Sequence, residues 1–404
     1  MFDHLLLAIG IGGLLTSTIY ALLAGLAALR FAARRRRSHA LGYCPPVSLL
    51  KPLHGWEPEL DEHLESFYRQ DYPQFEILFC VRNADDEALA IARRVAARHP
   101  QIPSKFLLSG EPPCANAKVW SLERMSQSAK HDIFVISDSD VSVTPEYLRE
   151  VIAPFAQSQI GMVTCLYRGV AGEGSSKGSA WSRLEATCMS VEMPSGVLVA
   201  EMLEGMKFAL GPTMAIRRAC VKQFGGFGVL GSYHADDFAL GNLVAAAGSQ
   251  VLLSTYVVEH HILNTTFLPS VLHNIRWMRS TRFSRPKGHL GTVLTFSMPY
   301  ALLAAAAALA MHRPGLAVLL LACGLATRVQ MALLTGALAV QDRAIVRNAL
   351  LFPLRDLFGF LCWAGSYLGN SVRWRGEVFQ VLGHRLMRSE PPAAEPKPES
   401  ILTT

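Results

Sequence analysis

Two aspartates close an apolar run near the middle of the chain. The stretch DIFVISDSDV, residues 132–141, contains Asp138 and Asp140 two positions apart, where a strand would end and the chain would turn. Two carboxylates in this arrangement can reach one hard cation, and Mg²⁺, which prefers oxygen ligands, is often shared with substrate phosphates. Aspartates also form turns and helix caps, so the pair by itself leaves both a metal site and a structural turn open.

Other residues able to bind an anion, a cation or a proton stand near the ends of apolar runs or the starts of helical ones. In chain order they are Lys51, Asp85, Asp86, Asn116, Lys118, Asp236, Asp237, Arg276 and Trp277. Each has a structural alternative, since acids are favoured in the first turn of a helix and a lysine is often a solvated surface charge. The ordered set as a whole favours one active site.

Residues 44–268 have the pattern of a soluble α/β domain, which would position these side chains. Strand-like apolar runs alternate with stretches of helical character; the runs are 47–53, 75–83, 105–110, 132–141, 161–170 and 250–258, and the helical stretches 57–70, 86–98 and 145–157. This alternation predicts a mainly parallel sheet covered by helices. Ligands of such sheets bind outside the carboxyl ends of the strands, where the aspartates stand. His260 and His261 follow the last run, and two interpretations stay open for them: a place at the mouth of an acceptor site, or a structural role, which the lack of metal-ligand spacing favours.

Long uncharged runs flank this domain and predict membrane helices. Residues 5–29 carry no charge and are long enough to cross a hydrocarbon core of about 30 Å. Arg30 and the four arginines at 34–37 follow the run, the reverse of the order in a cleaved signal peptide. We therefore expect residues 1–33 to be an anchor, with the chain after it on the cytoplasmic side.

The region 289–375 is predicted to return to the membrane. Residues 290–311 and 315–340 are long enough to span, whereas residues 357–372 are short and indicate a re-entrant or interfacial segment. Arginines after this segment favour a cytoplasmic carboxyl terminus. The chain is thus expected to be a multi-pass integral membrane protein with its catalytic domain on the cytoplasmic face of a bacterial inner membrane.

Two charged features of the membrane-proximal region need partners. Arg328 lies inside an apolar run and is costly in lipid, so we favour a pair with Asp342 or Asp356, with contact to an acceptor headgroup as the alternative. Residues 269–288 predict an amphipathic helix at the membrane surface, with a basic side towards lipid phosphates formed by Arg276, Arg279, Arg282 and Arg285. The tail, residues 389–404, is rich in proline and glutamate and is predicted to be disordered.

Composition narrows the class of protein. The 404 residues are 50% hydrophobic and only 17% charged, which excludes a disordered chain, a fibrous repeat and an ordinary soluble enzyme. The net charge of +6 is too small to predict nucleic-acid binding. The eight cysteines form no CxxC pair, which favours buried thiols in a reducing compartment.

The ordered set of charged residues resembles the membrane-bound ceramide glucosyltransferase family and its bacterial relatives, among the inverting glycosyltransferases of GT-A fold. The resemblance covers roughly residues 46–290, and the flanking membrane segments match in layout. The positions similar to the family's aspartate motifs and (Q/R)xxRW box are Asp85, Asp138, Asp140, Asp237, Arg276 and Trp277. The first residue of the box is His273 here, where the family pattern has Gln or Arg; a histidine can also donate hydrogen bonds.

This resemblance implies a UDP-sugar as donor and a divalent cation, Mg²⁺ or Mn²⁺, held by Asp138 and Asp140. It also implies that donor-binding side chains include Lys51, Asp85 at the uridine, Lys118 and Asp138. Lys118 and Arg276 are expected to help neutralise the departing diphosphate, and Trp277 belongs to the catalytic box with Arg276. Asp237 is expected to be the general base, with Asp236 raising its pKa. Because successive helix residues point about 100° apart, we expect only one of this adjacent pair to enter the site.

The implied function is transfer of a sugar, most simply glucose, to the hydroxyl of a ceramide-like membrane lipid with inversion. One alternative is a hopanoid glycosyltransferase that moves N-acetylglucosamine onto a polyol hopanoid. A second, from another class, is an inactive nucleotide-sugar-binding membrane scaffold, which would not need to retain all four motif aspartates. Too few membrane segments are predicted for the channel of a processive polysaccharide synthase.

Overall fold

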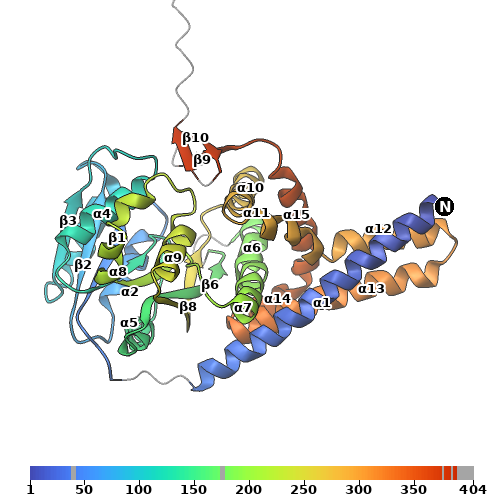
Figure 1. Ribbon diagram of the computed structural model, residues 1–404, viewed down its shortest axis with the longest axis horizontal. Helices are drawn as coiled ribbons and strands as arrows, with labels where there is room; N and C mark the ends of the chain where they lie inside the picture. The colour runs from blue at the N-terminus through green and yellow to red at the C-terminus, as the bar shows by residue number, and fades with distance from the viewer. Residues whose placement is uncertain (38–41, 173–177, 375–376, 384, 389–404) are drawn as a thin grey trace, which may run out of the picture.

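The computed structural model describes residues 1–37, 42–172, 178–374, 377–383 and 385–388. An α/β domain lies beside a bundle of apolar helices, and helices α6, α7 and α10 lie between the two (Figure 1). The tail predicted to be disordered, residues 389–404, is outside the described residues.

The α/β domain is built on an eight-stranded sheet in the order β3-β2-β1-β4-β7-β6-β8-β5. Its strands are β1 (Val47–Pro52), β2 (Phe75–Val81), β3 (Ser104–Leu108), β4 (Ile133–Ser137), β5 (Val141–Ser142), β6 (Ile160–Val170), β7 (Thr213–Arg217) and β8 (Gln250–His261). Strands β1 to β4 pair in parallel, as do β6 and β8, whereas β7 runs antiparallel to both β4 and β6, and β5 antiparallel to β8. The prediction of a mainly parallel sheet is confirmed, and β5 and β7 are the strands of this sheet that the apolar pattern did not predict as separate strands.

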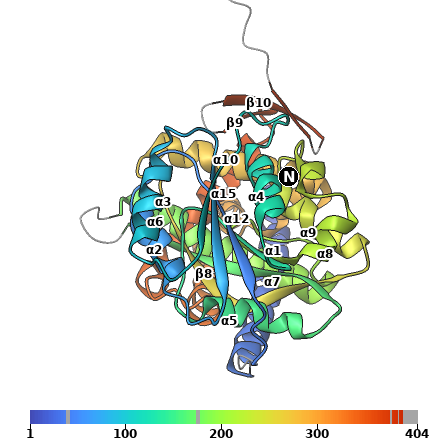
Figure 2. The ribbon, with the colours of Figure 1, turned by 90° about the vertical axis from the view of Figure 1, so that its left-hand side faces the viewer.

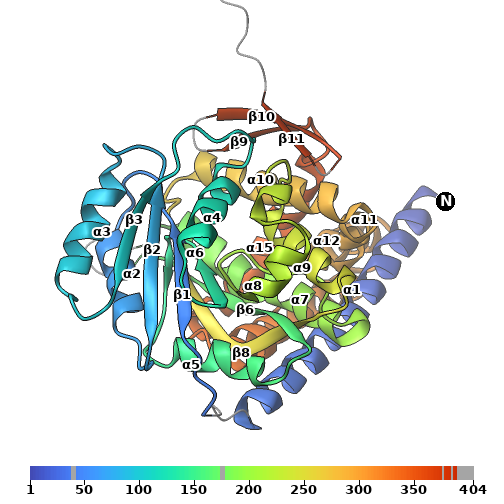
Figure 3. The ribbon, with the colours of Figure 1, turned by 60° about the vertical axis from the view of Figure 1, so that its left-hand side comes forward.

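Helices cover both faces of this sheet (Figures 2 and 3). They are α2 (Leu60–Tyr68), α3 (Glu87–Ala97), α4 (Ala117–Ser128), α5 (Tyr147–Ile152), α8 (Arg218–Gln223) and α9 (Asp236–Ala246), with the short turns η1 (Ala153–Ala156) and η3 (Phe227–Leu230). Leu49 of β1 joins the core formed with α2, α3 and α5, and its neighbour Leu50 joins the core formed with α4 and α9. Since alternate strand residues point to opposite faces, a strand buried on both sides becomes a continuous apolar run.

The helix bundle contains α1 (Phe2–Arg37), α12 (Met298–Ala310) and α13 (Pro314–Met331), the last continued by the π-helical η5 (Ala332–Ala339). These helices lie side by side (Figure 1). A Cβ at Gly10 of α1 would lie 2.6 Å from the Cβ of Ala304 on α12, so small residues permit this close packing. Leucines such as Leu15 and Leu22 are more than half exposed, as expected of a surface in contact with lipid.

Among the described residues, two helices are long and apolar enough to cross a membrane, Phe2–Arg36 and Pro314–Ala339. The run predicted as a span at 290–311 is instead bent by 45° between Pro286–Thr295 and Met298–Ala310, and it gives a third span only if the bent pair is counted as one. At this bend a carboxylate oxygen of Asp356, from α15 far along the chain, accepts hydrogen bonds from the Ser297 and Met298 backbone N–H groups at the start of α12.

Asp356 also holds the charge inside the bundle. Arg328 of α13 donates to its other carboxylate oxygen at 3.0 Å, and both side chains are 3% exposed. This confirms the second of the two partners expected for Arg328, while Asp342 caps the following turn by accepting from the Ala344 N–H. The ion pair offsets part of the cost of burying a guanidinium in an apolar bundle.

The remaining elements connect the two parts. They are α6 (Ala180–Thr187), the π-helical η2 (Cys188–Glu192), α7 (Met193–Glu204), α10 (Phe267–Ser284), α11 (Pro286–Gly291), η4 (Thr292–Thr295), α14 (Ile345–Asn348), η6 (Ala349–Leu351), α15 (Phe352–Gly365) and a small antiparallel sheet of β9 (Ser371–Trp374), β10 (Glu377–Leu382) and β11 (Arg385–Arg388).

The basic face predicted to meet lipid phosphates is engaged inside the protein. Arg279 donates to the backbone carbonyls of Leu368 and Ser371, and Arg282 donates to that of Ser366. Arg285 forms an ion pair with Glu204 of α7 at 3.6 Å, and Arg276 faces the cavity described below. The arginines at this spacing therefore fasten α10 to the chain after α15 and to α7, because main-chain carbonyls at the end of a helix need donors.

Candidate functional site

A cavity of about 580 Å³ lies at the carboxyl ends of the central strands, between the sheet and α10. It brings together residues from the β4–β5 turn, the start of α4, the start of α9, the end of β8 and α10. Six of the predicted site residues line it: Lys118, Asp138, Asp140, Asp237, Arg276 and Trp277. The carboxyl-end rule for α/β sheets thus locates the cavity.

The carboxylates of the two aspartates after β4 differ in their hydrogen-bond partners. Asp138 accepts a hydrogen bond from the Lys118 ammonium at 2.5 Å. Asp140 has one oxygen 3.5 Å from His260 Nε2, and its other oxygen, Oδ1, is buried without a hydrogen-bond partner among the described residues. Since a buried charged oxygen without a partner is costly, this donor set fits a hard divalent cation.

Lys118 and Lys51 both donate hydrogen bonds to Asp138, but their surroundings shift the pKa values of the two ammonium groups in opposite directions. Burial opposes the charge of Lys118, but the carboxylates of Asp138, Asp236 and Asp237 together raise the pKa of its ammonium above the ordinary value. Lys51 is fully buried beneath the turn, where it donates to the Asp138 backbone carbonyl at 2.6 Å and lies 3.8 Å from the centre of the Phe67 ring. Burial lowers the pKa of Lys51 to about 7, against the opposing effect of the Asp138 charge.

Two residues predicted to bind the donor do not line the cavity. Lys51 instead supports the Asp138 turn from below. Asp85 lies exposed in the turn after β2, whereas its neighbour Asp86 caps α3 by accepting from the Ala88 N–H at 2.9 Å. Asp86 also accepts from the Gly55 N–H, so it ties together the two loops that follow β1 and β2.

The adjacent acids at the start of α9 both line the cavity, and the expectation that only one would enter is wrong. The cavity wraps the end of the helix, so directions 100° apart both meet it. Asp236 accepts from the Asn116 side chain at 3.2 Å. Asp237 accepts from the Gly211 N–H at one oxygen and from the Phe238 N–H at the other, each at 2.7 Å.

The environment of Asp237 suits a proton acceptor. Burial first, and then the Asp236 charge, raise the pKa of Asp237 from its ordinary 3.8 to about 6. This confirms the expectation that Asp236 raises the pKa of its neighbour, although burial contributes more. Burial likewise raises the pKa of Asp236. A carboxylate with a pKa near 6 is a stronger base than an ordinary aspartate and is still mostly ionised at pH 7.

The box on α10 is anchored by a carboxylate that no sequence motif marks. His273 forms an ion pair at 2.5 Å with Glu185 of α6, a residue 2% exposed that also accepts from Ser270. Trp277 packs one turn further along against the His273 ring, with centroids 4.5 Å apart. The histidine that departs from the family pattern therefore fixes the box to α6. Burial lowers the pKa of Arg276, against the attraction of Glu185 and Asp140.

Further cavity residues come from positions without a recognisable motif, among them Glu57, Tyr167, His234, His260 and His261. Both histidines at the end of β8 line the cavity, which agrees with the less favoured of their two interpretations, a place at the mouth of the site, and not with a purely structural role.

A family model described as Glycosyl transferase family 21 matches residues 12–386. The chain is 27% identical over 236 residues to ceramide glucosyltransferase 1 of Caenorhabditis elegans, which covers 58% of this chain and 49% of that protein. It is 35% identical over 101 residues to the ceramide glucosyltransferase of Komagataella phaffii, covering 24% of this chain and 20% of that protein. The chain thus spans half the length, or less, of these curated relatives.

A solved structure shares the fold. It is the mannosyltransferase PcManGT from Pyrobaculum calidifontis in complex with GDP-Man and Mn2+, which is similar over 90% of this chain and 99% of its own, with a TM-score of 0.51 and 18% sequence identity. The likeness extends beyond the α/β domain into the helices that flank it.

Proposed function

The chain belongs to glycosyl transferase family 21, and from this membership and the geometry of the cavity we propose that it transfers glucose from UDP-glucose to the hydroxyl of a ceramide-like membrane lipid with inversion. The observation that carries the proposal is the meeting of Asp138, Asp140, Asp237 and Arg276 in one cavity beside the helix bundle. An inactive scaffold would not need to keep a cation site and a proton acceptor in the same space.

The donor end of the cavity is the side of Asp138 and Asp140. Oδ1 of Asp140, which has no hydrogen-bond partner within the described part of the chain, and the nearby carboxylate of Asp138 fit Mg²⁺ or Mn²⁺. When bound, such an ion would neutralise charge on the diphosphate of the nucleotide sugar. Lys118, charged and buried, and Arg276, on the opposite wall, supply further positive charge for the diphosphate that departs.

Asp237 is placed to remove the acceptor proton. As the lipid hydroxyl oxygen bonds to the anomeric carbon, its proton passes to a carboxylate oxygen of Asp237, and the bond from that carbon to the diphosphate breaks with release of UDP. Backbone N–H groups of Gly211 and Phe238 hold the carboxylate in one orientation, which spares its reorganisation during the step.

Apolar side chains in the lining of the cavity support a lipid acceptor. They are Met189, Met193, Phe208 and Leu263. Met193 begins α7, and α7 packs against α1 of the bundle. An alkyl chain lying along the bundle would therefore meet an apolar wall before its hydroxyl reached Asp237.

Contacts of α1 support the proposed cytoplasmic orientation. At its basic end Arg34 forms an ion pair with Glu201 of α7 at 2.6 Å, and Arg35 donates to the Thr255 carbonyl of β8. The catalytic domain thus lies at the end of α1 that carries the arginines, the end that membrane insertion retains in the cytoplasm.

The test is to incubate membranes that contain the protein with a panel of UDP-sugars and lipid acceptors and to identify the products by mass spectrometry. We expect a hexosylceramide with inverted anomeric configuration from UDP-glucose, and none from the Asp237→Asn variant. Product only from UDP-N-acetylglucosamine and a polyol hopanoid would replace the proposed acceptor. Absence of any product across the panel, with UDP-sugar still bound, would favour the scaffold.

A further inference from the structure

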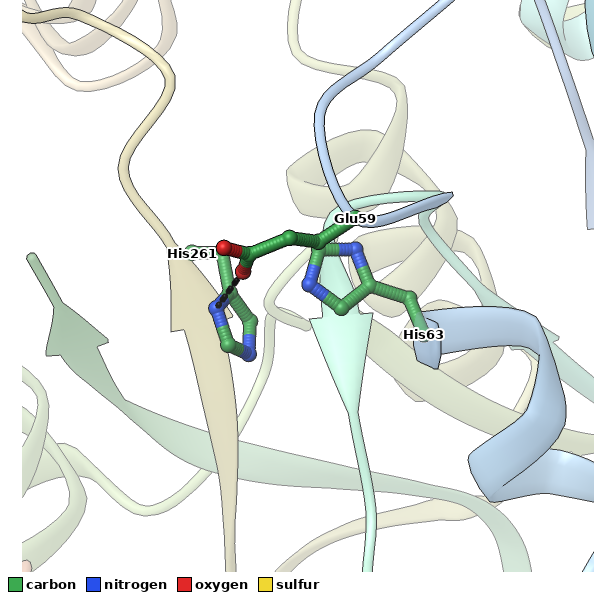
Figure 4. A group of neighbouring side chains, drawn as sticks. All are labelled: Glu59, His63 and His261. Carbon is green, nitrogen blue, oxygen red and sulfur yellow. Dashed lines mark ion pairs between the residues drawn. The ribbon is translucent and has the colours of Figure 1, made fainter. Parts of the chain in front are cut away.

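Three potential ligand groups converge beside the cavity: Glu59, His63 and His261 (Figure 4). Glu59 stands at the N-cap of α2 and His63 one turn later, where its N–H donates to the Glu59 carbonyl, so both face the same way. His261 reaches them from the end of β8. One ligand atom from each of the three lies within 4.8 Å of the others, and the two imidazole centroids are 4.1 Å apart.

The hydrogen bonds of His261 fix which ring nitrogen is free. Ser142 Oγ donates its proton to Glu259 at 3.2 Å, so in its 2.8 Å bond with His261 Nε2 the hydroxyl must accept. Nε2 therefore carries the proton, and Nδ1 presents a lone pair. That lone pair faces a carboxylate oxygen of Glu59 at 3.9 Å, and Nδ1 makes no hydrogen bond with the described residues. Two acceptors that face one another repel, and a cation between them would remove this repulsion.

The imidazole of His63 is buried, and its ring nitrogens have no hydrogen-bond partner among the described residues. The residue is 3% exposed. A buried imidazole without a partner is costly, and in the neutral form it is a metal ligand.

We propose that Glu59, His63 and His261 bind a transition-metal ion of the Zn²⁺ class, at a site separate from the hard-cation site of Asp138 and Asp140. Two imidazoles and one carboxylate supply three ligands and leave a fourth position for water. Bonds of about 2.0–2.1 Å in tetrahedral geometry place ligand atoms about 3.3 Å apart. The Glu59 side chain, 30% exposed, has the freedom to close the remaining distance.

Such an ion would fasten α2 to the end of β8. The His261 N–H donates to the Asp140 carbonyl at 2.8 Å, and the neighbouring His260 ring lies beside the Asp140 carboxylate. The Zn²⁺-class ion would therefore hold the backbone that positions Asp140, while Asp140 itself remains available to the hard cation. Imidazole ligands favour transition metals over Mg²⁺, so the two sites would be filled by different ions.

The experiment uses full-length protein in detergent, freed of metal and then saturated with Mg²⁺ to fill the carboxylate site. Co²⁺ is titrated in, and its visible absorption is recorded, because four-coordinate Co²⁺ absorbs far more strongly than six-coordinate Co²⁺. We expect one strongly absorbing equivalent that Zn²⁺ displaces. Glu59→Gln and His261→Gln should weaken its binding by roughly tenfold or more, whereas His131→Gln, on the loop before β4, should leave it unchanged.

Weak, six-coordinate absorption in the unsubstituted protein, or equal Co²⁺ binding by Glu59→Gln and the unsubstituted protein, would overturn the proposal. If His63→Gln or His261→Gln fails to fold, Glu59→Gln decides, because its partly exposed side chain can be changed without opening the core. As a second readout, Zn²⁺ should raise the thermal unfolding temperature of the unsubstituted and His131→Gln proteins but not that of Glu59→Gln.

Discussion

The pair Asp236→Asn and Asp237→Asn separates the proposed base from the group that tunes it. Both replacements keep the side-chain shape at the start of α9 and remove one charge. An asparagine at position 236 can still accept from Asn116, as Asp236 does, so local structure is preserved. An asparagine at position 237 retains only one acceptor for the two backbone N–H groups that Asp237 satisfies, and it cannot take a proton.

The sizes of the two effects follow from the causes of the raised pKa. Loss of a general base costs about 10²–10⁴ in kcat, or about 3–5 kcal/mol, so Asp237→Asn should be nearly inactive while it still binds UDP-sugar. Asp236→Asn removes the second cause but leaves burial, so the pKa of Asp237 should fall from about 6 but remain above 3.8. A base acts when deprotonated, so activity is lost as pH falls through this pKa. The acidic limb of the Asp236→Asn profile should therefore move to lower pH.

The assay is the rate of lipid glycosylation at saturating donor from about pH 5 to 8, measured beside UDP-sugar affinity. Wild-type rates from Asp237→Asn, with Asp236→Asn inactive, would show that the other carboxylate is the base. An acidic limb that stays in place, or moves to higher pH, in Asp236→Asn would refute the electrostatic coupling of the two acids.

Three further predictions test other parts of the chain. Asp140→Asn should weaken cation-dependent UDP-sugar binding by about tenfold or more, whereas Asp132→Asn, whose side chain is 96% exposed, should not; equal calorimetric affinities would exclude Asp140 as a ligand. Arg328→Met should destabilise the detergent-solubilised protein by about 3–5 kcal/mol because Asp356 is left unpaired, with exposed Arg313→Met as control; unchanged unfolding temperatures would contradict this. A cysteine added at the carboxyl terminus, in a background without other reactive thiols, should resist labelling from outside intact cells; ready labelling would place that end outside.

The apolar runs predicted six of the eight strands because those strands are buried on one or both faces and their side chains leave a readable pattern. Strand β7 was not predicted, because its five residues, Thr213–Arg217, follow Pro212 directly and resemble a loop between longer elements. Its antiparallel direction depends on pairing with β4 and β6, which no local pattern encodes. The bend before α12 was not predicted either, because the carboxylate that stabilises it, that of Asp356, lies in a distant segment of the chain.

The residues of the candidate site also fall into two groups, those that the sequence marks and those whose role depends on tertiary contacts. Asp138, Asp140 and Asp237 could be predicted because strand ends and helix starts mark them in the sequence. Glu185 could not be predicted, because its role depends on contact with His273, which lies 88 residues further along the chain. The Glu59 and His63 pair likewise acquires a role only when β8 brings His261 beside it.

The buried ion pair of Arg328 and Asp356 predicts the order in which the helices of the bundle assemble during synthesis. The arginine is synthesised 28 residues before its partner, and an unpaired arginine at the centre of a membrane helix costs about 2.5–3.5 kcal/mol. We therefore expect stable insertion of α13 to follow the synthesis of α15, and we expect the same of the start of α12, whose backbone N–H groups donate to the same carboxylate. Nascent chains arrested before Asp356 should leave α13 accessible to protease, while longer chains should protect it. Equal protection at both lengths would show that the late-arriving carboxylate does not govern biogenesis.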